Sequence, residues 1–556
     1  MKKHILFTIS LLLLSTFIFA QEKSKINIIN SDHIDHNQNE IPGAVLFVGN
    51  VEIEHDGIKM YADKIYRFDE RNAIKAFGNV RMNQGDTIHM DSEYAEYDGN
   101  RKFAYATGKV NLRSPDTRLV TDTIYFDRTI QQAYYTHYGT IYNADNVLKS
   151  KSGRFYMQQK KYQFLTAVTL TNPKYVLESN HLDYYTNSGH AYVFGPSTIT
   201  SKENYIYTEK GFYDTKKNLA HLLTNSYIKY DTQLIKGDSI YYDRNRDFSS
   251  ATRNVKVTDT VNKYIAKGHY AEVYKKQDSM YLEKRAVVIT LVEKDSLYTH
   301  AKRMVVTGKE GERIVRGYNN ARFYKIDMSG KCDSIHSDEA KGLTQMIGRP
   351  VVWNGESQLT GDVIHLISNN KTEQLDSLKV LNNAFVVQKD TIWKDTLTPR
   401  YNQVKGINLY GLFRDNKMYQ VDLVKNTERI YYSYDDDNEL IGIDKAASSK
   451  IRMELQDNEI QTVTSFVKVD ASTYPESELP ENARKLRGFI WRGDERIKSK
   501  DDIFPPEEQE IHEQMVKETK EDELKEEKPM EPLPQTLDYD KDNPKPKQAA
   551  QKPKKI

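Results

Sequence analysis

The feature that most constrains this chain is a short motif that returns at a nearly fixed interval. It reads Gly-Asn-Val at Gly49 and Gly78, Gly-Lys-Val at Gly108 and Gly-Thr-Ile at Gly139. Weaker copies continue to Arg285, about 28 to 32 residues apart. A second motif, such as ADKIY, lies between successive copies. Self-similarity at this period predicts one repeated unit of about 29 residues rather than several unrelated domains.

The side chains between these motifs follow the pattern of half-buried β-strands. Reverse-turn signals such as YDGN recur about 14 residues apart, so each repeat predicts one hairpin. Between the turns, apolar side chains alternate with polar ones, which is the period of a strand and not of a helix. The residues expected to line one apolar face are Val51, Ile53, Ile58, Met60, Val80, Met82, Ile88 and Met90.

Glycine near the middle of many strands predicts a bend. The expected strands are about 11 residues long, well above the usual five or six, and glycine inside a strand lets the backbone bulge or turn sharply. The glycines expected to mark one line of bends are Gly49, Gly78, Gly108, Gly139 and Gly195. A long antiparallel meander creased along this line would become an all-β, V-shaped trough whose apolar faces look at each other.

The motifs AFGNV, ATGKV, ADKIYRFD and TDTIYFD resemble those of the OstA-like family of lipopolysaccharide transport proteins, and residues 406–463 resemble a later module of its long Bacteroidetes-type members. The resemblance implies an elongated antiparallel meander folded as a V-shaped β-jellyroll, or β-taco. It places OstA-like repeats at residues 41–395 and a second OstA-like module at 396–475. It also implies a periplasmic location, lipopolysaccharide as ligand, and other lipopolysaccharide-transport proteins as partners.

Both ends of the chain differ in character from the repeats. Residues 1–20 have two lysines, an apolar run and a final Ala20, which predicts a signal peptide cleaved after Ala20, and residues 21–40 read as a polar leader. Residues 476–500 are expected to hold a short amphipathic helix that carries Phe489 and Trp491. Residues 501–556 are runs of Glu, Lys and Pro, which predicts a disordered charged tail.

Composition excludes several classes of protein. The 80 basic and 79 acidic residues balance, so charge gives no argument for binding nucleic acid. The single cysteine, Cys332, rules out an intramolecular disulfide and a cysteine zinc site. The chain contains no nucleophile elbow, phosphate loop or zinc spacing. We therefore expect a protein that is not an enzyme and needs no cofactor or metal.

Three further patterns have an ordinary alternative to the functional one. Asp32, His33, Asp35 and His36 could ligate a metal, but an exposed spacer is the simpler interpretation. Asp435, Asp437 and Glu439 could hold calcium, but a charged hairpin turn explains them as well. The many tyrosines could form a sugar-binding platform, although tyrosine also suits the outside of a sheet.

The leading functional hypothesis is a periplasmic lipid conduit, in which the trough shelters acyl chains of lipopolysaccharide. Its rival is a structural or adhesive exported protein that binds protein partners through its sheet edges, and a β-helical polysaccharide lyase is a third option. The first strand, residues 43–55, is expected to be an unprotected edge that pairs with a partner's strand or with a second copy, head to tail.

Overall fold

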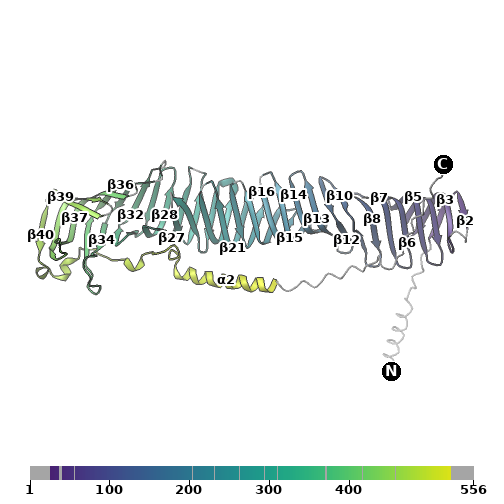
Figure 1. The fold of residues 1–556 in the computed structure, drawn as a ribbon. Helices are drawn as coiled ribbons and strands as arrows, with labels where there is room; N and C mark the ends of the chain where they lie inside the picture. The colour runs from purple at the N-terminus through teal and green to yellow at the C-terminus, as the bar shows by residue number, and fades with distance from the viewer. Residues whose placement is uncertain are drawn as a thin grey trace, which may run out of the picture. The chain divides into compact units, whose positions relative to one another are not determined.

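The computed structural model describes residues 26–526, except residues 37–40, 56, 203, 231, 262, 293–294, 310, 370–371, 373, 416 and 457–458. The chain divides into two compact units, of which the first ends at Ile503. That unit is built almost entirely from antiparallel β-strands (Figure 1), so the all-β meander expected from the repeat is confirmed. The predicted signal peptide and its cleavage after Ala20 lie outside the described residues.

The N-terminal part of the sheet consists of long strands and of pairs of short strands that lie in line. Its strands are β1 (Asn27–Asn30), β2 (His33–Asp35), β3 (Val45–His55), β4 (Ile58–Phe68), β5 (Ala73–Gln84), β6 (Ile88–Asp98), β7 (Phe103–Ser114), β8 (Thr117–Asp127), β9 (Gln132–Tyr135), β10 (Gly139–Asn143), β11 (Asn146–Ser150), β12 (Ser152–Tyr156), β13 (Lys161–Asn172), β14 (Tyr175–Tyr185), β15 (His190–Ser201) and β16 (Asn204–Asp214).

The same pattern continues to the end of the sheet. The remaining strands are β17 (Leu219–Thr224), β18 (Ser226–Tyr230), β19 (Gln233–Gly237), β20 (Ser239–Asp243), β21 (Phe248–Asp259), β22 (Tyr264–Tyr274), β23 (Ser279–Glu283), β24 (Val287–Val292), β25 (Asp295–His300), β26 (Arg303–Thr307), β27 (Ile314–Lys325), β28 (Met328–Asp338), β29 (Leu343–Ile347), β30 (Val351–Asn354), β31 (Ser357–Thr360), β32 (Val363–Ser368), β33 (Leu375–Leu381), β34 (Ala384–Lys389), β35 (Tyr401–Gly406), β36 (Asn408–Arg414), β37 (Lys417–Tyr434), β38 (Leu440–Gln456), β39 (Glu459–Phe466) and β40 (Asp470–Tyr474).

Two short strands in line are equivalent to one long strand that is interrupted at its middle. For example, β9 and β10 pair with the two halves of β8, and β12 and β11 pair with the two halves of β13. The expected second module at residues 396–475 is joined to the first without a break, because β34 pairs with β35 across the expected boundary. One sheet therefore runs through both.

Each long strand with a mid-strand glycine at positive φ has a β-bulge at that glycine. In β5, Gly78 and Asn79 have φ values of 75° and 43°, and the register with β4 and β6 shifts between Phe77 and Val80. An extra residue in one strand bends it and increases its twist. We call this line of bulges the crease. Three other glycines hold the equivalent place, with positive φ and a register shift: Gly49, Gly108 and Gly195.

Gly139 does not belong to this set, and the expected role for it is wrong. Its φ is not in the left-handed region, and the residue with positive φ in this copy is Tyr138, at 49°. Gly139 instead lies against the ring of Tyr135, where a Cβ atom would overlap that ring. It is glycine because a side chain approaches it closely, not because the backbone bends there.

The crease extends beyond the copies that carry glycine. Consecutive residues with positive φ recur as far as the last rung, in the pairs Thr166–Ala167, Arg253–Asn254, Lys284–Arg285, Asn319–Asn320, Asn382–Asn383, Lys425–Asn426 and Val467–Lys468. The sequence motif fades after Arg285, but the backbone geometry does not. Asn is among the few residues other than glycine that adopt the left-handed region readily, which accounts for its frequency in these pairs.

The two sequence motifs meet at the crease. The Asn79 side-chain amide donates a hydrogen bond to Asp63 of the ADKIY motif over 2.8 Å. We call the series of such contacts the crease ladder. Its further members are Asn50 with Asp32 (2.9 Å), Lys109 with Glu93 (2.8 Å), Asn225 with Glu209 (2.9 Å), Asn254 with Asp238 (3.0 Å) and Asn383 with Asp362 (3.1 Å).

The first two strands differ from two expectations, because the expected polar leader contains both strands and the expected free edge is paired with them. Ile28 of β1 lies opposite Ile53 of β3, and Ile34 of β2 lies opposite Phe47. The strand expected to be an open edge is therefore paired on both sides, with β1 and β2 on one side and β4 on the other. Among the described residues, β1 and β2 pair only with β3, so they form the N-terminal edge.

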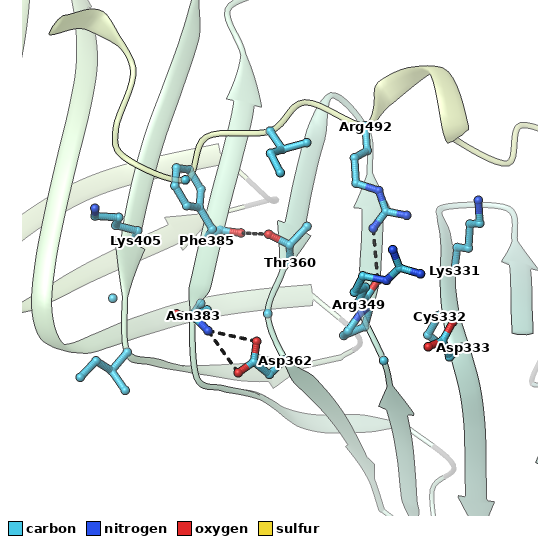
Figure 2. Close-up of a pocket in the computed structure, with 18 of the residues that line it drawn as sticks. Lys331, Cys332, Asp333, Arg349, Thr360, Asp362, Asn383, Phe385, Lys405 and Arg492 are labelled. Carbon is cyan, nitrogen blue, oxygen red and sulfur yellow. Dashed lines mark hydrogen bonds between the residues drawn. The ribbon is translucent and has the colours of Figure 1, made fainter. Parts of the chain in front are cut away.

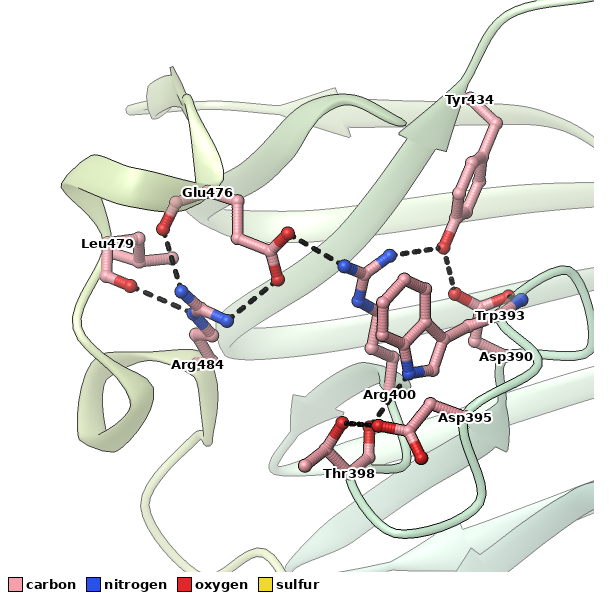
Figure 3. A network of polar contacts seen from close by, with 9 residues as sticks. All are labelled: Asp390, Trp393, Asp395, Thr398, Arg400, Tyr434, Glu476, Leu479 and Arg484. Carbon is pink, nitrogen blue, oxygen red and sulfur yellow. Dashed lines mark hydrogen bonds and ion pairs between the residues drawn. The ribbon is translucent and has the colours of Figure 1, made fainter. Parts of the chain in front are cut away.

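A segment we call the strap, residues 475–503, replaces the helix expected at residues 476–500. It contains three 3-10 turns, η3 (Glu476–Glu478), η4 (Glu481–Arg484) and η5 (Gly493–Glu495). At its start, Glu476 accepts hydrogen bonds from Arg400 (2.7 Å) and Arg484 (2.8 Å) (Figure 3). The Arg400 guanidinium also lies 3.4 Å from the ring centre of Trp393, so it joins the strap to the loop before β35.

Two buried glutamines hold the strap against the sheet. The Gln403 side chain donates to the Arg484 carbonyl oxygen and accepts from the Leu486 N–H, each over 2.9 Å. Gln358 donates in the same way to the Ile490 carbonyl (2.8 Å) and accepts from the Arg492 N–H (2.7 Å). Each primary amide thus supplies the donor and acceptor that a neighbouring strand would offer, which satisfies buried backbone groups of the strap.

The second compact unit begins at Phe504. It contains the helix α2 (Pro506–Glu526), so this part of the tail that was expected to be disordered is helical. Glu513 and Lys517 are four residues apart, a spacing at which opposite charges support an exposed helix even where little can be buried. Residues 527–556 lie outside the described residues. No helix among the described residues is both long enough and apolar enough to span a membrane.

Candidate functional site

An apolar cavity of about 310 Å³ lies inside the N-terminal part of the sheet. Its lining comes from both sides of the crease. We call one side arm 1, which includes residues 45–48, 64–68, 73–77 and 94–98. We call the other side arm 2, which includes residues 51–55, 58–62, 80–84 and 88–92. Ile74 of arm 1 and Met82 of arm 2 belong to the same strand, β5, and both line the cavity. The two arms therefore face each other across one apolar space.

The bulge explains how both arms present apolar side chains. In β5, the buried residues Ala76 and Val80 lie on opposite sides of the crease, four positions apart. In β4, which has no extra residue, the buried residues on either side of the crease are Ala62 and Ile65, three positions apart. The one-residue difference keeps the interior faces of neighbouring strands together on both arms.

Six of the eight residues predicted to face the trough line this cavity: Ile53, Ile58, Met60, Met82, Ile88 and Met90. The other two, Val51 and Val80, are completely buried and do not line it. They pack in the core behind the lining, next to the crease. Arg81, which follows Val80, is exposed on the opposite face.

Aromatic side chains form the far end of the cavity, and the sequence pattern did not single them out. Tyr135 is 3% exposed, its ring lies against Gly139 and Gly153, and its hydroxyl is 2.7 Å from the Ser150 hydroxyl. Burial raises the pKa of Tyr135 to about 12, so it remains a neutral, apolar wall. Phe155, Tyr162 and Phe164 complete this end. The two glycines that flank Tyr135 were the available signal.

Polar residues stand at the tips of the arms. The Tyr97 hydroxyl lies 3.4 Å from His55 Nε2, and Arg128 Nη1 lies 3.5 Å from the same hydroxyl. Gln84, Ser114 and Thr117 line the cavity at other hairpin ends. The site is thus apolar within and polar at its edge, an arrangement that suits a ligand with an apolar part and a hydrated part.

The interior is filled differently farther along the chain. From Ile206 to Met453, 35 buried hydrophobic residues form a single cluster, which includes Met304, Met346 and Leu423. Side chains in this part of the sheet form a continuous packed core. The apolar cavity and this packed core therefore lie in different parts of the sheet.

The two candidate metal sites have structural explanations. Asp32 accepts a hydrogen bond from Asn50 in the crease ladder, and His33 and Asp35 belong to β2. The Asp435 carboxylate accepts the backbone N–H groups of Asp437 (3.0 Å) and Glu439 (2.8 Å), as in a hairpin turn. The part of the chain that the structure describes contains no group of three or more metal-ligating side chains.

Comparison with known proteins finds a similarity in the N-terminal region. A sequence model described as OstA-like protein matches residues 23–180, the segment that contains most of the cavity lining. Among solved structures, the chain matches LptH, described as the LptA homologous periplasmic component of the conserved lipopolysaccharide transport device from Pseudomonas aeruginosa. That match has 16% identity and a TM-score of 0.21, and covers 27% of this chain and 95% of that one. No curated protein matches. Over residues 23–180, the chain is thus similar to the OstA-like family.

Proposed function

We propose that this OstA-like chain is a non-enzymatic periplasmic bridge or scaffold for the transport of lipopolysaccharide to the outer membrane, and that its N-terminal cavity holds the acyl chains. The observation that carries the proposal is the apolar space between the two arms, within the family-matched segment. The lining is mainly aliphatic, methionine and aromatic side chains, with polar groups at the arm tips. Such a surface suits binding and transfer of a lipid.

Apolar burial contributes about 25 cal/mol per Å² and has no preferred direction. A groove lined by Ile53, Ile58 and Met90 can therefore bind an acyl chain in several registers of similar energy, which allows it to slide. Met60 and Met82 suit chains of different shape because the thioether side chain has three rotatable bonds. The polar groups at the arm tips leave room for a hydrated head group to stay in water.

Partner proteins would join at the ends of the sheet. An open sheet leaves unpaired N–H and C=O groups on its terminal strands, which natural proteins cover or use. Among the described residues, β1 and β2 pair only with β3, and β39 and β40 pair only with β38. Edge pairing at these strands would extend the sheet into a transport partner or into a second copy of this chain.

The test is photo-crosslinking in living cells, with one probe replacing Met82 and a control probe replacing its neighbour Arg81. Met82 lines the cavity, whereas Arg81 is exposed on the other face. We expect lipopolysaccharide to crosslink to the probe at position 82 and not at position 81. Equal crosslinking at both positions, or none at either, would refute the lipid-binding role. Protein partners captured at the sheet edges without any lipid would favour a structural or adhesive function.

A further inference from the structure

A second, larger cavity lies far from the apolar one, between the crease and the strap (Figure 2). Its volume is about 1,050 Å³. The crease contributes residues from successive rungs, including Asn320, Arg349, Asn383 and Asn426, and strap residues from Arg487 to Glu495 cover them. The glutamine contacts of the strap fix this cover in place, so the cavity is formed before any ligand arrives.

Positive charge exceeds negative charge at one end of this cavity. Lys331 and Arg492 both contact Glu495, at 2.7 Å and 2.8 Å. Arg349 is the third cation there, since Arg492 Nη1 donates to the Arg349 backbone carbonyl over 3.1 Å. No carboxylate among the described residues lies within ion-pair distance of the Arg349 guanidinium. With Asp333, which also lines this end, three cations face two carboxylates, which leaves one positive charge in excess.

Arg349 also departs from the crease ladder. It follows Gly348 and has a φ of 49°, the place that Asn79 holds after Gly78. In the ladder, this residue pairs with a carboxylate of the preceding rung, and here the carboxylate in that place is Asp333, which lies against Gly348. No ion pair between Arg349 and Asp333 is formed. The guanidinium is therefore available to the cavity, which it lines beside Lys331 and Arg492 (Figure 2).

The rest of the lining can bind hydroxyl groups. Asn383 donates to both carboxylate oxygens of Asp362, each over 3.1 Å, and Asn320 and Asn426 also line the cavity. Amide and carboxylate groups offer both donors and acceptors to a ligand. A nucleotide fits less well, because the only aromatic side chain in the lining, Phe385, is 7% exposed and offers little ring surface for a base.

We propose that this cavity binds an anionic saccharide, with the anionic group on Arg349, Lys331 and Arg492 and the sugar hydroxyls on the amides of the crease. Guanidinium groups bind phosphate or carboxylate oxygens through two parallel hydrogen bonds, which gives geometry as well as energy. The volume exceeds what a bare phosphate ion needs. This site is independent of the acyl-chain cavity at the other end of the sheet.

The test is titration calorimetry on the full chain with glucose 1-phosphate, glucose and inorganic phosphate as probes. We expect glucose 1-phosphate to bind at least about tenfold more tightly than either of the others. Arg349→Asn should weaken that binding by at least about tenfold. The variant restores the Gly-Asn sequence of ordinary crease copies, and Asn tolerates the left-handed backbone, so the fold should persist. Lys109→Asn, the same crease position in another rung, is the control and should bind normally.

Three outcomes would overturn the proposal. Glucose 1-phosphate could fail to bind at millimolar concentration, or it could bind Arg349→Asn as well as the unmodified chain. Inorganic phosphate could bind as tightly as glucose 1-phosphate, which would leave an anion site and refute the saccharide part. Lipid crosslinking at position 82 should be unchanged in Arg349→Asn, so failure here is distinguishable from failure of the transport function.

Discussion

The Tyr97 hydroxyl and the His55 Nε2 atom lie 3.4 Å apart although the two residues stand at the tips of opposite arms. Their ring centres are 5.4 Å apart, and Arg128 approaches the same hydroxyl. Both rings line the apolar cavity. This contact therefore bridges the two arms at one rung. Under the proposed function, a lipid that entered or left sideways at this point would have to separate the two side chains.

Tyr97→Ala should open the mouth and speed lipid entry. The substitution removes the ring that spans the gap and the hydroxyl that contacts His55, while the backbone pairing of β6 is retained. We expect a faster rate of fluorescent lipopolysaccharide uptake, measured by stopped flow. Tyr97→Phe keeps the ring, so its uptake rate should lie between those of the unmodified protein and Tyr97→Ala. A rate equal to or below that of the unmodified protein would show that this contact does not gate entry.

Met82→Arg should impair lipid capture with little effect on folding. A charge placed in an apolar cavity without a partner costs several kcal/mol once a ligand excludes water, but before loading the long side chain can reach the polar arm tips. Arg81→Glu changes charge on the exposed face and is the matched control. We expect lipid recovered with the purified protein to drop for Met82→Arg only. Equal recovery for both variants would contradict an apolar binding surface.

Asn79→Asp should destabilise the fold, although Asn79 is exposed. Its amide donates to Asp63 over 2.8 Å, and the substitution would place two carboxylates in that contact. Losing the hydrogen bond and gaining like-charge repulsion should cost about 1 kcal/mol or more. The midpoint of urea unfolding, followed by circular dichroism, measures the effect. Asp63→Asn in the same chain should restore part of the loss, and an additive loss would argue against direct contact.

Much of the fold was accessible from sequence because one physical pattern repeats many times. Alternating polarity and turn residues specify the strands. Gly49, Gly78 and Gly108, which all have positive φ, mark the crease. Gly139 misled because glycine also serves close approach of a side chain, and the sequence alone does not distinguish the two uses. From Thr166 onward, Asn and other residues take most of the left-handed positions, so most copies lack the glycine of the motif while the geometry continues.

The site was predicted in part for a related reason. Alternation identifies which face of a strand is apolar, which is how Ile53 and Met82 were found. It does not say whether an apolar side chain is packed in the core, as Val51 and Val80 are, or lines a cavity. The strap was missed because Gln358 and Gln403, which hold it, belong to no motif, and pairing through a side-chain amide has no periodicity to detect.

The strap should loosen when the pH falls well below 4. Hydrogen bonds from Arg492 and Lys331 lower the pKa of Glu495 to about 2, even though partial burial opposes this shift. A lowered folded-state pKa contributes stability that is present above the ordinary value of about 4.5 and is lost as the pH falls toward 2. Cleavage of the strap by pepsin, which is active in this range, should rise between those values. Glu495→Gln should be cleaved readily throughout, and a parallel pH profile for both proteins would contradict the assignment.

Gly139→Ala and Gly195→Ala should both destabilise, for different reasons that a second substitution separates. A Cβ at position 139 would overlap the Tyr135 ring, which Gly153 and the Ser150 hydroxyl hold from the other side. Overpacking of this kind costs about 1–3 kcal/mol. A Cβ at position 195 would meet no atom within 4 Å, so its cost comes only from the φ of 78° and should be about 1–2 kcal/mol.

Two rescue variants test this distinction, with urea unfolding midpoints as the measurement. Tyr135→Leu gives the Cβ at position 139 more room, so combining it with Gly139→Ala should cost less than the sum of the two single changes. It should be strictly additive with Gly195→Ala, because no contact links the two sites. Gly195→Asn should be better tolerated than Gly195→Ala, since Asn adopts the left-handed region more readily. Additivity at position 139, or equal loss from Ala and Asn at position 195, would mean that these two glycines are retained for the same reason after all.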